Sequence, residues 1–251
     1  MTDGSASVGS LLKAAISRMG AAQASCLAAL VVAVALTVST NVLPLALRPL
    51  VVLVAIVIAQ GALYRHAFGR SRGINGLRWG RDEWRLLGAH LMGLGLFLLI
   101  GSILLIVIGA ITLGVARASA PQLDVGSAQA WRAALANAGP AGFVAGLAPL
   151  VALAILTWLA LRLSFTAPAT VAESGIRVLS AFPLTKGKVP ILLLPGVFAL
   201  PMAANLLYAL APPRGVVSTA GSAILAYVVM APIWSVMMAH LYRQSAVSQD
   251  A

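Results

Sequence analysis

Long apolar segments alternate with short basic stretches along the whole chain. Between neighbouring Lys and Arg residues, six intervals are long and apolar, and they cover residues 19–47, 49–64, 86–116, 133–161, 189–213 and 215–242. A bilayer core is crossed by about 20 apolar residues of helix, and a charge at its centre is costly. The interval 49–64 is short, but Arg48 and Arg65 at its ends can extend to the headgroups. The pattern predicts an all-α polytopic transmembrane bundle of six helices.

Two of the polar segments between the spans predict additional helices. The second half of the basic segment 65–85 has amphipathic periodicity and predicts a helix that runs into the third span. Residues 127–138 predict a short helix, capped by Ser127 and stopped near Gly139.

The elbow 161–190 joins the fourth and fifth spans. Pro168 is expected to interrupt the helix there, and Glu173 and Arg177 have the i,i+4 spacing that supports a short helix. Together with the helix expected before the third span, this elbow predicts short interfacial helices on the cytoplasmic side.

The distribution of cations between alternate loops predicts the orientation. One side holds 13 of the 17 basic residues, including Lys13, Arg18, Lys186 and Arg243, and the other side holds 4. By the positive-inside rule both termini are expected in the cytoplasm, as in a multi-pass protein of a bacterial inner (plasma) membrane.

Three segments are expected along the chain. Residues 1–20 form an N-terminal cytoplasmic amphipathic segment, because Leu11, Ala15 and Met19 share one helical face. Residues 21–243 form a six-helix transmembrane domain, and residues 244–251 form a cytoplasmic tail. No soluble catalytic domain is expected.

Composition supports a membrane location and limits the chemistry. Charged residues make up 9% and apolar residues 61% of the chain, whereas a soluble domain has about 25% charged residues. The formal net charge of +11 is explained by topology and by contacts with anionic lipid. No basic domain is present to bind nucleic acid, so no nucleic-acid partner is expected.

Candidate catalytic and metal-binding residues are sparse. The six acidic residues fall in loops, elbows or tails, and the three histidines and one cysteine are dispersed. We therefore expect no catalytic residues, no metal site and no cofactor, and we expect a protein that is not an enzyme. Gln60 and Asn205 lie nearest the interior of the spans and are expected to form interhelical hydrogen bonds.

The basic cytoplasmic segments are the best functional candidates. Arg78, Arg81 and Arg85 are expected on one helical face, where they would hold a lipid head group. Fixing the topology of the chain explains the same arginines equally well. In the elbow, Glu173 is expected to pair with Arg177 or Arg162 and so form a structural latch.

Three stretches carry a family resemblance. They are the elbow from Arg162, with Arg-Leu-Ser, Pro-Ala, Val-Ala-Glu, Leu-Ser-Ala-Phe and Leu-Thr-Lys-Gly-Lys in that order, residues 77–87, and the ending Ala239-His-Leu-Tyr-Arg243. From about residue 60 onward the chain resembles the membrane domain attached to some bacterial glycerophosphoryl diester phosphodiesterases, and its free-standing inner-membrane relatives. Ala181-Phe-Pro stands where a Ser-Trp pair is common. The resemblance implies an α-helical membrane domain; it does not imply phosphodiesterase activity, whose residues lie in a soluble domain.

These observations favour an integral inner-membrane protein without catalytic function. Its expected role is that of a module that contacts membrane lipids, anionic phospholipid in particular, or binds a membrane-protein partner. The main alternative is a small transporter or permease-like protein for an apolar or zwitterionic solute. A membrane-embedded lipid enzyme is a third hypothesis, and it requires Glu173, a histidine and arginines to converge.

Overall fold

The computed structural model describes residues 8–71, 74–186, 189–210 and 215–247, and within these ranges the elements are helices. No strand occurs in the described ranges; the one isolated β-bridge that they contain joins Ile74 and Leu77. The expectation of an all-α fold is confirmed. In chain order the elements are α1 (Val8–Ser39), η1 (Thr40–Val42), α2 (Arg48–Ala67), α3 (Arg81–Ser119), α4 (Ala128–Asn137), α5 (Pro140–Leu163), α6 (Thr166–Ala172), η2 (Leu179–Ala181), η3 (Pro183–Thr185), α7 (Val189–Tyr208), α8 (Val216–Ile224), the π-helical η4 (Leu225–Met230) and α9 (Ala231–Val247).

Apolar helices of membrane-spanning length dominate the fold. Five helical segments in the described residues are long and apolar enough to cross a bilayer: Gly9–Val42, Arg48–Ala67, Arg81–Ser119, Pro140–Ala172 and Val216–Ser245. They overlap the first four predicted spans and the last. The fifth predicted span, 189–213, contains α7, whose apolar part Gly196–Tyr208 is shorter. The chain is a polytopic membrane protein.

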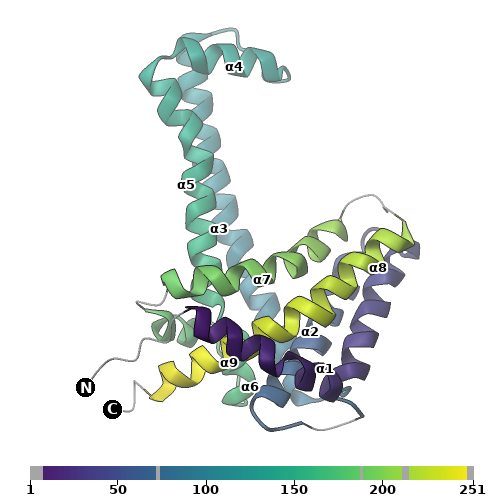
Figure 1. Cartoon of the computed structure of the whole chain (residues 1–251). Helices are drawn as coiled ribbons and strands as arrows, with labels where there is room; N and C mark the ends of the chain where they lie inside the picture. The colour runs from purple at the N-terminus through teal and green to yellow at the C-terminus, as the bar shows by residue number, and fades with distance from the viewer. Residues whose placement is uncertain (1–7, 72–73, 187–188, 211–214, 248–251) are drawn as a thin grey trace. The chain divides into compact units, whose positions relative to one another are not determined.

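The chain divides into two compact units, Met1–Leu91 with Leu161–Ala251 and the intervening Met92–Ala160. In the first unit α1 packs against α2, α8 and α9, while α2 also contacts α6 and α7 (Figure 1). Small side chains such as Ala29, Ala33, Ala55 and Ala59 are fully buried in its core. Such residues allow helix backbones to approach closely, which is how helices associate within membranes.

Polar side chains connect the helices inside the first unit. The Gln23 amide of α1 donates a hydrogen bond of 2.7 Å to the backbone carbonyl of Val228, which lies in the π-helical turn η4. Thr37 of α1 donates to the Tyr227 hydroxyl at 3.3 Å. A π-helical turn disturbs the regular pattern of backbone hydrogen bonds, so a side chain that binds its carbonyl supports it.

The second unit is a helical hairpin. Its parts of α3 and α5 run in opposite directions and are joined through α4 (Figure 1). As predicted, Ser127 caps α4, because its hydroxyl accepts from the Ala130 backbone N–H at 3.2 Å. The Ser119 hydroxyl donates to the Ala134 carbonyl at 2.6 Å. Many apolar side chains of both long helices are exposed, as lipid-facing residues of a membrane hairpin are.

The structure corrects the predicted helix in the elbow. Helix α6 ends at Ala172, and Ser174 has a positive φ of 54°, which terminates the helix before Arg177. Pro168 lies in the first turn of α6, where its missing N–H leaves no hydrogen bond unmade. The interruption falls instead at the turn Ser164–Phe165.

The structure also gives the course of the chain near residues 20 and 78. Helix α1 continues from Val8 through residue 20 without interruption, so residues 8–20 belong to the same helix as the first span. Helix α3 begins at Arg81, so Arg78 lies before the helix rather than on a face with Arg81 and Arg85. Asn75 and Gly76 both have positive φ, which excludes a continuous helix through those positions.

Candidate functional site

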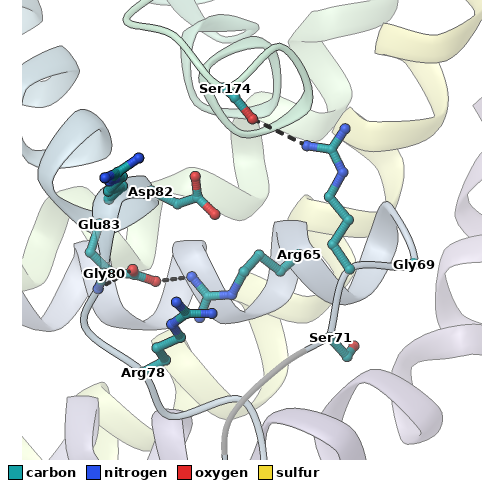
Figure 2. Close-up of a pocket in the computed structure, with 10 residues that line it drawn as sticks. Arg65, Gly69, Ser71, Arg78, Gly80, Asp82, Glu83 and Ser174 are labelled. Carbon is teal, nitrogen blue, oxygen red and sulfur yellow. Dashed lines mark hydrogen bonds and ion pairs between the residues drawn. The ribbon is translucent and has the colours of Figure 1, made fainter.

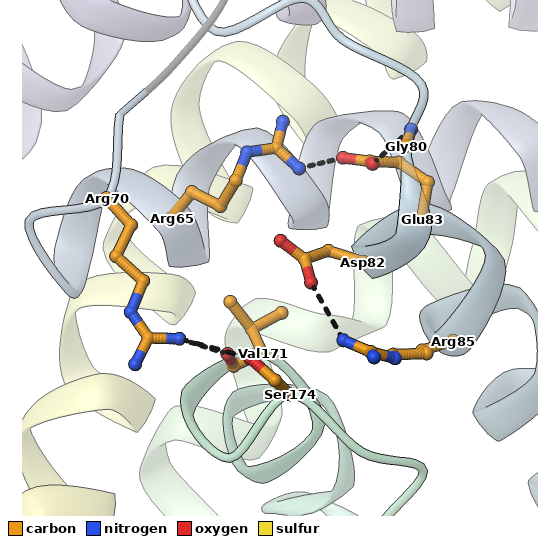
Figure 3. A network of polar contacts seen from close by, with 8 residues as sticks. All are labelled: Arg65, Arg70, Gly80, Asp82, Glu83, Arg85, Val171 and Ser174. Atoms are coloured by element: carbon orange, nitrogen blue, oxygen red, sulfur yellow. Dashed lines mark hydrogen bonds and ion pairs between the residues drawn. The ribbon is translucent and has the colours of Figure 1, made fainter.

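A buried ion pair joins the end of α2 to the start of α3. Arg65 of α2 is 3% exposed, Glu83 of α3 is 1% exposed, and the guanidinium Nη1 pairs with the carboxylate Oε1 (Figure 3). The Nη2 group of Arg65 donates to the Gly76 carbonyl at 3.1 Å. Buried charges are tolerated only with such partners, so this pair fixes the segment between the two helices.

Glu83 has a second role at the first turn of α3. Its Oε2 atom accepts a hydrogen bond of 2.8 Å from the backbone N–H of Gly80. This is the reciprocal half of a capping box, and the negative charge is favourable at a helix N-terminus. Gly61 of α2 leaves room for the carboxylate, because a Cβ atom there would lie 2.7 Å from Glu83 Oε1.

The connection between α2 and α3 contains a tight turn. Asn75 and Gly76 have φ values of 46° and 77°, and the Leu77 N–H donates to the Ile74 carbonyl at 3.0 Å. Positive φ at both central residues is the signature of a type I′ turn, for which Asn-Gly is preferred. A Cβ at Gly76 would lie 3.0 Å from the Cys26 Cα of α1, so the turn packs directly against that helix.

Arg70 connects the same segment to the elbow. Its Nη1 donates to the Val171 carbonyl at 3.0 Å and lies 3.5 Å from the Ser174 hydroxyl (Figure 3). The carbonyl belongs to the last turn of α6, where a cation is favourable. Arg70 is therefore held in place while much of its side chain stays exposed.

These elements border an open pocket of about 670 Å³ (Figure 2). It is lined by Arg65, Gly69, Arg70, Ser71, Arg78, Gly80, Arg81, Asp82, Glu83 and Ser174, and we call it the arginine pocket. Four guanidinium groups face two carboxylates. Glu83 is neutralised by Arg65, and Asp82 lies 3.5 Å from Arg85.

Two of the pocket's arginines have no polar partner among the residues that the structure describes. Arg78 and Arg81 are exposed, and among the described residues neither forms a hydrogen bond or an ion pair. Arg78 is also near enough to Arg65 for their charges to interact. An anion in the pocket would relieve this repulsion and satisfy their N–H donors.

The structure separates the three arginines that were predicted to share one helical face. The structure brings Arg78 and Arg81 to the arginine pocket, whereas Arg85 lies outside its lining and contacts Asp82. Sequence reasoning missed Arg65 and Arg70 as members of the site. The position of Arg65 at the end of an apolar span and the Asn75-Gly76 dipeptide were the available signals.

Two tryptophans are adjacent in sequence to residues that line the arginine pocket. The rings of Trp79 and Trp84 meet edge to face, with centroids 5.3 Å apart and an interplanar angle of 87°. Both are exposed, by 39% and 61%. Exposed tryptophans at the ends of membrane helices are typical of headgroup depth.

The predicted latch forms in part and includes a residue that the sequence did not suggest. Glu173 Oε2 lies 2.9 Å from Arg177 Nε, which confirms the expected pair. Its Oε1 accepts a hydrogen bond of 2.6 Å from the Tyr242 hydroxyl of α9. Glu173 therefore contacts both Arg177 in the elbow and Tyr242 of α9, and so it connects the elbow to the last helix.

Arg162 is held on another part of the elbow. Its Nη1 donates to the Thr185 hydroxyl at 3.2 Å, and its guanidinium lies 5.4 Å from the centre of the Phe182 ring. These contacts join the end of α5 to η3 and so brace the elbow at its beginning and end.

No group of three or more potential metal ligands occurs among the described residues. No family model, curated protein or solved structure matches the chain.

Proposed function

We propose that the chain is a bacterial inner-membrane module, without catalytic function, that binds the head group of an anionic phospholipid in the arginine pocket. Both termini lie in the cytoplasm in this proposal. The observation that carries it is the cavity bounded by Arg70, Arg78 and Arg81 at the ends of apolar helices.

The charge in the pocket suits a phosphodiester. Arg65 is engaged by Glu83, and Asp82 is shared with Arg85, which leaves three guanidinium groups facing the cavity. A phosphodiester carries one negative charge and presents oxygen acceptors that arginine forks match well.

The position of the pocket also supports a lipid. It lies at the C-terminal end of α2 and the N-terminal end of α3, two helices of membrane-spanning character, and Trp79 and Trp84 lie beside it in sequence. The excess of cations predicts that these ends face the cytoplasm, where anionic lipids give the membrane surface a negative potential.

We include in this proposal that the chain is related to the membrane domain of bacterial glycerophosphoryl diester phosphodiesterases. Such a domain would serve as a membrane-embedded support for lipid contact or for a membrane-protein partner. The exposed apolar side chains of Leu98, Ile106 and Val144 in the second unit are compatible with either lipid or protein neighbours.

Binding of phosphatidylglycerol with a fluorescent tail tests the proposal in a neutral detergent. Replacing Arg78 and Arg81 with Gln should weaken binding about fivefold for each residue, because each cation near an anionic surface contributes about 1 kcal/mol. Arg132→Gln, in α4, removes the same charge away from the pocket and should leave the affinity unchanged. Equal affinity of the double variant and the wild type would refute the proposal.

One observation favours a solute passage as a second candidate function. The Oε1 atom of Gln60 in α2 is buried, and it has no hydrogen-bond partner within the described residues. Buried polar groups without partners are rare, and a hydrated path would supply their partners.

The second candidate is tested by cysteine labelling. A Gln60→Cys variant in which Cys26 is replaced by Ala should react with a small water-soluble thiol reagent if the path is hydrated. A lack of labelling, while an exposed Ser17→Cys control reacts fully, would exclude this candidate.

A further inference from the structure

A second cavity in the first unit has a different chemistry from the arginine pocket. Its volume is about 270 Å³, and Arg18 of α1, His66 of α2 and both His240 and Arg243 of α9 line it. Its other lining residues are small or apolar, and no carboxylate is among them. We propose that this histidine-arginine pocket binds a phosphomonoester group. The inference does not depend on the proposed phosphodiester site.

Arg243 is oriented for this role by its own contacts. Its Nη2 donates to the Ala67 carbonyl, and its guanidinium lies 5.2 Å from the centre of the Phe68 ring. A cation over a ring face is attracted to it, and the planar group keeps further N–H donors for a ligand. The end of α2 therefore holds Arg243 at the edge of the cavity.

Arg18 reaches the same cavity from α1. It is exposed, and within the part of the chain that the structure describes it forms no hydrogen bond or ion pair. Two guanidinium groups from different helices thus face one cavity without a carboxylate. Such a concentration of positive charge is compensated by a bound anion.

The two imidazoles add directional donors. The Gln244 amide nitrogen lies 3.1 Å from His240 Nε2. This contact engages Nε2 and leaves His240 Nδ1 for another partner. His66 Nδ1 lies 3.4 Å from the Ser71 hydroxyl, which leaves its Nε2 for another partner.

The number of acceptors and charges identifies the ligand class. A phosphomonoester carries between one and two negative charges near neutral pH and has three strong acceptor oxygens. Arginines and imidazoles from three helices can approach these oxygens from different directions. The lining of the histidine-arginine pocket contains two arginines, two histidines and no carboxylate that would repel the second charge.

The phosphomonoester can be carried by a lipid or by a soluble molecule, and two probes separate these sources. The wild-type protein is placed in phosphatidylcholine nanodiscs that contain phosphatidic acid, and the enrichment of this lipid around the protein is measured. In parallel, glycerol 3-phosphate is titrated into nanodiscs of phosphatidylcholine alone, with the unfolding temperature as the readout. The variants are Arg18→Gln and His240→Gln, and Lys13→Gln on α1 is the charge-matched control outside the pocket.

We expect Arg18→Gln to weaken the response about fivefold and Lys13→Gln to leave it unchanged. A response to phosphatidic acid alone assigns a lipid ligand, and a response to glycerol 3-phosphate assigns a soluble one. The Arg78→Gln/Arg81→Gln variant should retain the response, which separates this site from the arginine pocket. Equal responses of the wild type, Arg18→Gln and His240→Gln to both probes would overturn the inference. So would an equal loss in the Lys13→Gln control.

Discussion

The ion pair between Arg65 and Glu83 should make a large contribution to the stability of the site. We consider Glu83→Gln, which preserves the size of the side chain and an oxygen for the Gly80 N–H but removes the negative charge. The Arg65 guanidinium would then be left buried, with only the Gly76 carbonyl as a strong partner. The matched control is Asp82→Asn, because Asp82 makes a longer and more exposed contact with Arg85.

The expected magnitudes differ because the two acidic residues differ in burial. Removing one partner of a buried ion pair costs about 3–5 kcal/mol, whereas an exposed pair contributes about 0–1 kcal/mol. The side chains of Arg65 and Glu83 are 4% and 1% exposed, while those of Arg85 and Asp82 are 32% and 30% exposed. For a chain of this size the loss corresponds to a decrease in Tm of about 6–20 °C for Glu83→Gln.

Thermal unfolding in a mild detergent provides the assay, and a double-mutant cycle isolates the interaction. Replacing Arg65 with Met as well should restore much of the stability lost in Glu83→Gln, because no uncompensated charge then remains buried. The reasoning is refuted if Glu83→Gln and Asp82→Asn lower the Tm equally. It is also refuted if the losses of stability caused by Glu83→Gln and Arg65→Met add up in the double variant.

Two further substitutions and one control test neighbouring contacts. Gly61→Ala should lower stability, although alanine favours helix by up to about 1 kcal/mol, because its Cβ would lie 2.7 Å from Glu83 Oε1. Gly20→Ala, with open space around it, should be neutral or stabilising in the same unfolding assay; similar results for both would contradict the packing. Tyr242→Phe removes the 2.6 Å hydrogen bond to Glu173 and should cost about 1 kcal/mol while increasing hydrogen exchange in the elbow. Unchanged exchange there would argue against the tie between the elbow and α9.

The spans and the cap of α4 were predictable because their signals are local. An apolar run of bilayer length predicts a helix whatever its neighbours are, and Ser127 precedes its helix in the sequence. The Glu173–Arg177 pair was predicted on the basis of helical spacing, yet it forms across a turn. Long side chains four residues apart can meet in a helix and also across a turn. The ion pair was therefore predicted correctly although the predicted helix over these residues does not form.

The members of the arginine pocket were harder to predict because they depend on tertiary packing. Arg65 is buried only because Gly61 leaves space for Glu83 and the turn at Gly76 presents a carbonyl. A basic segment alone suggests a solvated surface. The contact between Glu173 and Tyr242 joins residues 69 positions apart, and no local pattern indicates it.

The central claim is that the arginine pocket binds an anionic phospholipid, and native mass spectrometry tests it most directly. The wild type and the Arg70→Gln/Arg78→Gln/Arg81→Gln variant are purified in parallel in mild detergent from the same bacterial host. The account predicts that the wild type retains an anionic phospholipid, which the variant loses while remaining folded. A wild type that carries no lipid, or a variant that retains the same anionic lipid to the same extent, would contradict the account.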